Sequence, residues 1–74
     1  MNKQRRDRLG KVFDQITEGM DVVDAVRREE EESYDNLPDS FRDGERGEEM
    51  QNYMEMLEEV SNYLDDARSV LEQI

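Results

Sequence analysis

The chain contains no cysteine, no histidine and no tryptophan, and its 74 residues include only one proline. Without cysteine there is no disulfide. Without cysteine and histidine there is neither a typical zinc site nor a Ser–His or Cys–His nucleophile pair. The glycines match neither nucleotide-binding fingerprint, since they stand at Gly10, Gly19, Gly44 and Gly47. These absences remove most of the ways in which a small chain builds a catalytic or cofactor site.

Long apolar runs are also absent. No stretch of about 20 apolar residues occurs, so the sequence predicts no membrane span. The basic N-terminus is not followed by the apolar segment of a signal peptide. We therefore expect a cytoplasmic protein without cofactor or metal. Carboxylates for acid–base catalysis are plentiful, but a helical hairpin offers little cleft in which to shift their pKa values, so we expect no enzyme.

Acidic residues outnumber basic ones by 21 to 10, which gives a formal net charge of −11. The charge is uneven: residues 1–11 hold five basic residues and one acidic residue (+4), whereas residues 12–74 hold five basic and 20 acidic residues (−15). An acidic body repels nucleic acid and anionic lipid, and it suits a basic protein surface. Acidity also keeps a small helical protein soluble, and composition alone does not separate these two roles.

The C-terminal third, from Met50 to Ile74, has the period of an amphipathic helix. Because one helix cannot bury its own apolar stripe, the rest of the chain or a second copy must cover it. Two positions of a heptad repeat are apolar throughout. Met50, Leu57, Leu64 and Leu71 occupy one of them, and Tyr53, Val60, Ala67 and Ile74 occupy the other. The oligomer core is expected at Met50, Tyr53, Leu57, Val60, Leu64 and Leu71.

A second amphipathic helix is predicted over about residues 4–33. Gly19 stands where another apolar residue would continue its stripe. It either ends a helix or lies inside a continuous one, at a cost of about 1 kcal/mol relative to alanine. The stripe keeps its phase across Gly19, which favours the continuous helix, and a small residue there lets a partner helix approach closely. The stripe consists of Leu9, Val12, Ile16, Val23 and Val26, flanked by Phe13 and Met20.

Residues 34–44 form the predicted chain reversal. Pro38 displaces the preceding residue from the helical region and suits the first position of a short helical turn that ends at Arg42. Asp43 or Gly44 then caps the second helix, predicted over about residues 45–73. Two helices of similar length and one connection predict an all-α antiparallel hairpin, a single domain spanning residues 1–74. A monomer this small buries little, so we expect hairpins to assemble into a helical bundle.

The segment YDNLPDSFRDGERGEEM, residues 34–50, resembles small acidic helical proteins of bacteriophages and prophages, a family of unassigned role. Those proteins read E-x-Y-D-N-L-P-E-S followed by E-R-G-E-x-M, so Asp39 departs from the pattern, and residues before Arg27 hardly match. The resemblance implies the hairpin fold and a phage setting, hence the cytoplasm of an infected bacterium. It implies no binding or catalytic residues. The matching residues are Glu32, Tyr34, Asp35, Asn36, Leu37, Pro38, Ser40, Glu45, Arg46, Gly47, Glu48 and Met50.

Three functions fit these observations. The first is a protein-binding inhibitor, for example an anti-CRISPR or anti-restriction protein, that presents nucleic-acid-like negative charge to the basic surface of a host defence effector. Charge-rich faces are also commonly just solvated. The residues expected to form this acidic surface are Glu29, Glu30, Glu31, Glu32, Asp35, Glu48, Glu49, Glu55, Glu58, Glu59, Asp65 and Asp66.

The second function is a structural or assembly protein, a homodimeric helical bundle whose only chemistry is its own interface. The third is an oligomer that binds a phosphorylated small molecule through its basic N-terminus, against the simpler interpretation of a solubilising tail. The residues available for such an anion site are Lys3, Arg5, Arg6, Arg8 and Lys11.

Overall fold

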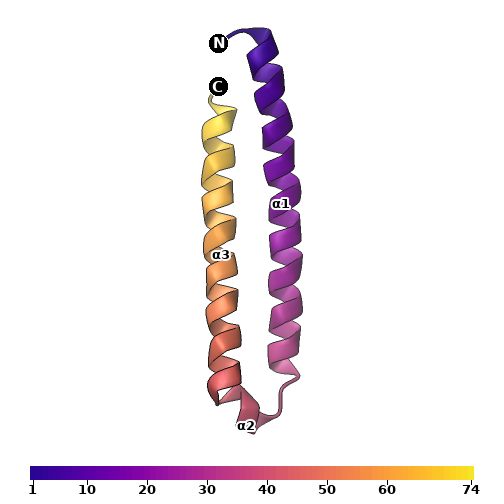
Figure 1. Ribbon diagram of the computed structural model, residues 1–74, viewed down its shortest axis with the longest axis vertical. Helices are drawn as coiled ribbons and strands as arrows, with labels where there is room; N and C mark the ends of the chain where they lie inside the picture. Colours follow the sequence, from indigo (N-terminus) through magenta and orange to yellow (C-terminus); the bar gives the residue numbers. More distant parts are fainter.

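The computed structural model describes all residues, 1–74, and contains three helices: α1 (Lys3–Asp35), α2 (Asp39–Arg42) and α3 (Glu45–Glu72). The two long helices lie side by side and antiparallel, with α2 in the connection at one end and both termini at the other (Figure 1). The N-terminal turns of α1 extend beyond the end of α3. The molecule is a rod of 58 × 14 × 12 Å. The predicted all-α antiparallel hairpin is confirmed.

Helix α1 runs without interruption through Gly19, as the phase of its apolar residues predicts. Its start is fixed by Asn2, whose side-chain oxygen accepts a hydrogen bond of 2.9 Å from the backbone N–H of Arg5. Its last turn has no basic residue to balance the helix dipole. About two turns before the end of the helix, Arg27 pairs with Asp24 at 3.4 Å and with Glu31 at 3.2 Å, which offsets part of the repulsion among the glutamates.

The connection is organised around Pro38, which is the N-cap of α2. Its carbonyl accepts hydrogen bonds from the backbone N–H groups of Phe41, at 2.9 Å, and Arg42, at 3.0 Å. Gly44 then caps α3 without a side-chain hydrogen bond. Negative charge is favoured at a helix N-terminus, and the first turn of α3 provides it with Glu45 and Glu48.

Gly47 allows the tightest contact of the chain. It is one of only two buried residues, and a Cβ atom placed on it would overlap the backbone carbonyl of Arg42. Only glycine therefore lets α3 begin directly above the connection. The next turn supplies Met50, which at 9% exposed is the only buried hydrophobic residue.

The contact between α1 and α3 is a single seam of partly buried residues spaced by threes and fours, as in coiled coils. On α3 the seam includes small and polar residues beside the leucines, so it is narrower than a globular core. On α1 it consists of Leu9, Phe13, Ile16, Met20, Val23, Arg27, Glu30 and Tyr34. On α3 it consists of Gly47, Met50, Met54, Leu57, Ser61, Leu64, Arg68 and Leu71.

Only one of the two predicted heptad positions on α3 lies in this seam. The position of Leu57 and Leu64 faces α1, whereas that of Tyr53 and Val60 is exposed. The structure of α1 differs from its predicted stripe in the same way. Phe13, predicted beside the stripe, lies in the seam, whereas Val12 and Val26, predicted within the stripe, are exposed. The reason is that each helix carries two apolar stripes side by side, and hydrophobicity alone does not say which of them the intramolecular partner covers.

We predict that Gly47→Ala destabilises the hairpin by about 1–3 kcal/mol, since the new methyl group must displace the Arg42 carbonyl. Thermal unfolding followed by circular dichroism measures this. Gly10→Ala is the matched control: a Cβ atom there meets nothing within 4 Å, and alanine in a helix interior stabilises by about 0.5–1 kcal/mol. Equal melting temperatures for the two variants would contradict the assigned contact.

Candidate functional site

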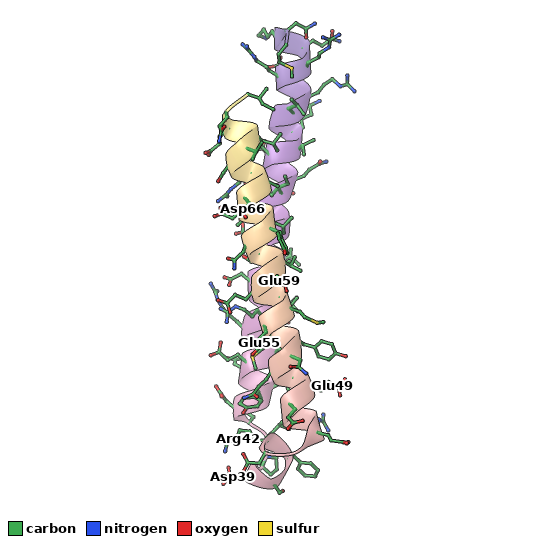
Figure 2. All side chains as sticks on the ribbon, turned by 90° about the vertical axis from the view of Figure 1, so that its left-hand side faces the viewer. Asp39, Arg42, Glu49, Glu55, Glu59 and Asp66 are labelled. Carbon is green, nitrogen blue, oxygen red and sulfur yellow. The ribbon has the colours of Figure 1, made fainter.

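The acidic residues singled out in the sequence lie on the surface of the rod, and among them only Glu30 is partly buried. Three of them, Glu55, Glu59 and Asp66, form a row along the side of α3 that faces away from α1 (Figure 2). The row spans 12 residues, from Glu55 to Asp66, a rise of about 16 Å along the helix. We call these three residues the outer acidic row.

Few of the predicted acidic residues are neutralised within the chain. Glu31 pairs with Arg27 at 3.2 Å and Asp65 with Arg68 at 3.0 Å, and the other ten form no ion pair. The outer acidic row is therefore free to attract a cationic surface. The only side-chain hydrogen bond to a residue of this row is the one of 3.2 Å that the Tyr63 hydroxyl donates to Glu59.

The negative charge is densest at the connection. Residues 29–50 hold ten acidic and two basic residues, a net charge of −8. Along α3, nine carboxylates occur in 28 residues, about one per 5 Å of helix axis. A single strand of B-DNA carries one phosphate per about 3.4 Å. The spacing of charge along α3 is thus comparable with that of a nucleic acid backbone.

The five basic residues of the N-terminus do not converge on one site within the chain. Lys3 pairs with Asp7 at 3.3 Å. Arg5 and Arg8 line one shallow hollow of α1, whereas Arg6 lines a different one, which also involves the end of α3. Lys11 lines neither hollow. An anion site at this end would need residues from more than one chain.

The residues predicted as the oligomer core separate into two groups. Four of them face α1 within the hairpin, so they serve the intramolecular contact: Met50, Leu57, Leu64 and Leu71. The other two, Tyr53 and Val60, are 50% and 41% exposed. Within the hairpin, only the second group is therefore exposed to a second chain.

Arg68 is a residue that the sequence reasoning missed. It occupies a seam position of α3, and its guanidinium donates a hydrogen bond of 3.3 Å to the Thr17 hydroxyl and lies 5.7 Å from the centre of the Phe13 ring. Near the connection, Gln51 donates a hydrogen bond of 2.8 Å to the Tyr34 hydroxyl. Both links cross between the helices on the same side of the hairpin, which we call the linked face.

The chain contains no enclosed site. Its hollows are shallow, and no group of carboxylates is placed to hold a metal ion. None of the helices combines the length and the apolar character needed to cross a bilayer. A scan against protein-family models gives no match, and searches of curated proteins and of solved structures give none either. The exposed surfaces of the rod are therefore the features that it offers to a partner.

Tyr53 provides a pH probe of one such surface. Its hydroxyl donates a hydrogen bond of 3.0 Å to Glu49, and this bond, with the charge of Glu49, raises the pKa of Tyr53 above its usual value of 10.0. The folded state thus favours protonated Tyr53. Its contribution to stability is complete below pH 10 and is lost as the pH rises through the raised pKa.

We predict that Glu49→Gln lowers the pKa of Tyr53 toward 10.0. The measurement is a spectrophotometric titration of tyrosinate, with Tyr53→Phe identifying the step that belongs to this residue. Glu55→Gln removes the same charge without touching Tyr53 and serves as control. An unchanged titration in the Glu49 variant would show that the hydrogen bond does not form in solution.

Proposed function

We propose that this protein is a non-catalytic inhibitor that binds the basic, nucleic-acid-gripping surface of another protein. The observation that carries the proposal is the outer acidic row, which stands unpaired by any cation on a rigid helix. In this proposal the carboxylates take the place of phosphates in a groove lined by lysine and arginine.

The rigidity of the rod supports this role. The row lies on one uninterrupted helix, Glu45–Glu72, so its carboxylates keep a fixed spacing without a partner. A preorganised charge array loses little conformational entropy on binding, and most of its attraction is then available as affinity. Flexible acidic tails lack this advantage.

The resemblance of residues 34–50 to acidic phage proteins supports a more specific target. We propose a bacterial defence effector that grips nucleic acid, such as a CRISPR nuclease or a restriction enzyme, in the cytoplasm of an infected cell. Such effectors carry extended basic grooves, and occupying one of them blocks access of the nucleic acid. The proposed partner is thus a protein, with no direct contact between the acidic body and nucleic acid.

The test compares two triple variants that remove equal charge. Glu55→Gln, Glu59→Gln and Asp66→Asn neutralise the outer acidic row, whereas Asp14→Asn, Glu18→Gln and Asp21→Asn neutralise exposed, unpaired residues of α1. Affinity for purified CRISPR and restriction nucleases is measured by titration calorimetry at low and high salt. The first variant is expected to bind at least about tenfold more weakly, because three charge contacts are lost.

Wild-type affinity should also fall steeply with salt, and nucleic acid should compete for the same effector. The α1 variant should bind like the wild type. Equal losses in the two triple variants would mean that only net charge matters. Binding that ignores both salt and nucleic acid would falsify charge mimicry.

A further inference from the structure

Helix α3 carries a second apolar stripe that α1 does not cover. Its members recur at spacings of three and four, the pattern of a coiled-coil seam. Five of its large side chains are between 49% and 65% exposed, and Val60 is 41% exposed. A stripe of this length and regularity is costly to leave in water. It consists of Tyr53, Met56, Val60, Tyr63, Ala67, Val70 and Ile74.

Helix α1 carries a matching stripe of Val12, Gly19 and Val26, spaced by sevens. Ser33 continues the same spacing, and it lines a hollow together with Tyr53 of α3. The two stripes therefore lie on one side of the hairpin, opposite the linked face. We call this side the apolar face.

The exposed area is larger than a monomer of this mass should have. The chain exposes 5936 Å² at 8.8 kDa, whereas folded monomers of that mass expose about 4,800 Å². The excess is roughly 1,100 Å², and a stable protein interface covers about 800 Å² or more per partner. A second hairpin covering the apolar face would remove an area of this size.

Charge on the apolar face fixes the direction of that partner. At the open end of the rod, Arg5 and Arg8 line the hollow beside Val12. At the connected end, Glu30 and Glu49 line the hollow beside Tyr53 together with Arg46, which leaves a net charge of −1 there. Two copies that face each other in opposite directions bring the basic end of each onto the acidic end of the other. Two copies in the same direction would place both acidic ends together.

Gly19 marks the centre of this arrangement. Within the chain its missing side chain has no purpose, since a Cβ atom there meets nothing within 4 Å, and it costs about 1 kcal/mol relative to alanine. A two-fold axis at Gly19 brings the two α1 helices together where neither has a side chain. The same axis sets Val12 against Val26 of the second copy and Arg8 against its Glu30, because both pairs are centred on residue 19.

We propose that two copies of this chain associate through their apolar faces, antiparallel, about a two-fold axis at Gly19, to form a four-helix bundle. In this arrangement α1 lies along the full length of α1 of the second copy, whereas α3 overlaps its counterpart over about residues 58–74, because Thr17 is level with Arg68 and Tyr34 with Gln51. Four helices around a shared core are the smallest arrangement that buries both stripes of each helix. This proposal is independent of any target bound by the outer acidic row.

A charge exchange tests the interface. Arg8 and Glu30 lie 22 residues apart on one continuous helix, about 33 Å, so they cannot meet within a chain. Sedimentation equilibrium of the full chain should show a dimer. Arg8→Glu and Glu30→Arg should each weaken it about tenfold, since every dimer contains the contact twice, and the double variant should restore it.

Arg6→Glu makes the same charge change outside the apolar face and should leave the dimer intact. A monomer at all concentrations would overturn the proposal. A dimer that responds equally to Arg6→Glu and Arg8→Glu would overturn the assigned face. A double variant no tighter than the single variants would overturn the antiparallel direction.

Disulfide formation gives a second test, which the absence of native cysteine makes unambiguous. An oxidised mixture of Val12→Cys chains with Val26→Cys chains should give a covalent dimer. Either variant alone should give none, because residue 12 faces residue 26 of the second copy. Both substitutions replace exposed side chains, so circular dichroism should show an unchanged hairpin. Cross-linking of either variant with itself would contradict the register.

Discussion

Two helices share only one line of contact, and this constraint governs the whole molecule. Along that line the hairpin buries Gly47 and Met50 and covers the other seam residues in part. Everything that distinguishes the chain chemically therefore remains on its surface: the outer acidic row, the basic N-terminus and the apolar face. The proposals made for this chain therefore rest on its exposed faces.

The fold was predictable because its signals are local. A continuous apolar period predicts α1 through Gly19, and Pro38 marks the reversal. The composition of the seam was not predictable from hydrophobicity, because Ser61 and Arg68 lie in it, whereas the apolar period places the neighbouring Val60 and Ala67 in the core. Arg68 is tolerated since its alkyl chain lies along the seam while its guanidinium reaches Thr17 and the Phe13 ring at the edge.

The candidate site was predictable only as a set of residues. Composition identifies the acidic side chains, but their directions depend on which stripe of α3 faces α1. Once the position of Leu57 and Leu64 is assigned to the hairpin, Glu55 and Glu59 must point outward. Gly47 and Gly19 also differ in whether a contact within the chain explains them. Gly47 is explained by a contact within the chain, whereas Gly19 acquires a reason only when a second chain is present.

The proposed dimer also fixes where the two outer acidic rows lie relative to each other. The antiparallel dimer stacks α3 on α3 of the second copy, with helix axes about 8–10 Å apart. Both outer acidic rows then lie on one edge of the bundle and run away from the two-fold axis in opposite directions, with the two Asp66 residues nearest the axis. Each chain brings a net charge of −11, so self-association works against electrostatic repulsion, and pairing of Arg8 with Glu30 offsets part of it.

Salt is expected to affect binding to a basic effector and association of two hairpins differently. Screening weakens attraction between the carboxylate rows and a basic partner, and it also weakens repulsion between two acidic hairpins. Apolar burial, which holds the proposed bundle together, is not reduced by moderate salt. A dimer that persists at high ionic strength while a bound effector dissociates is therefore the behaviour that this distribution of charged and apolar faces implies.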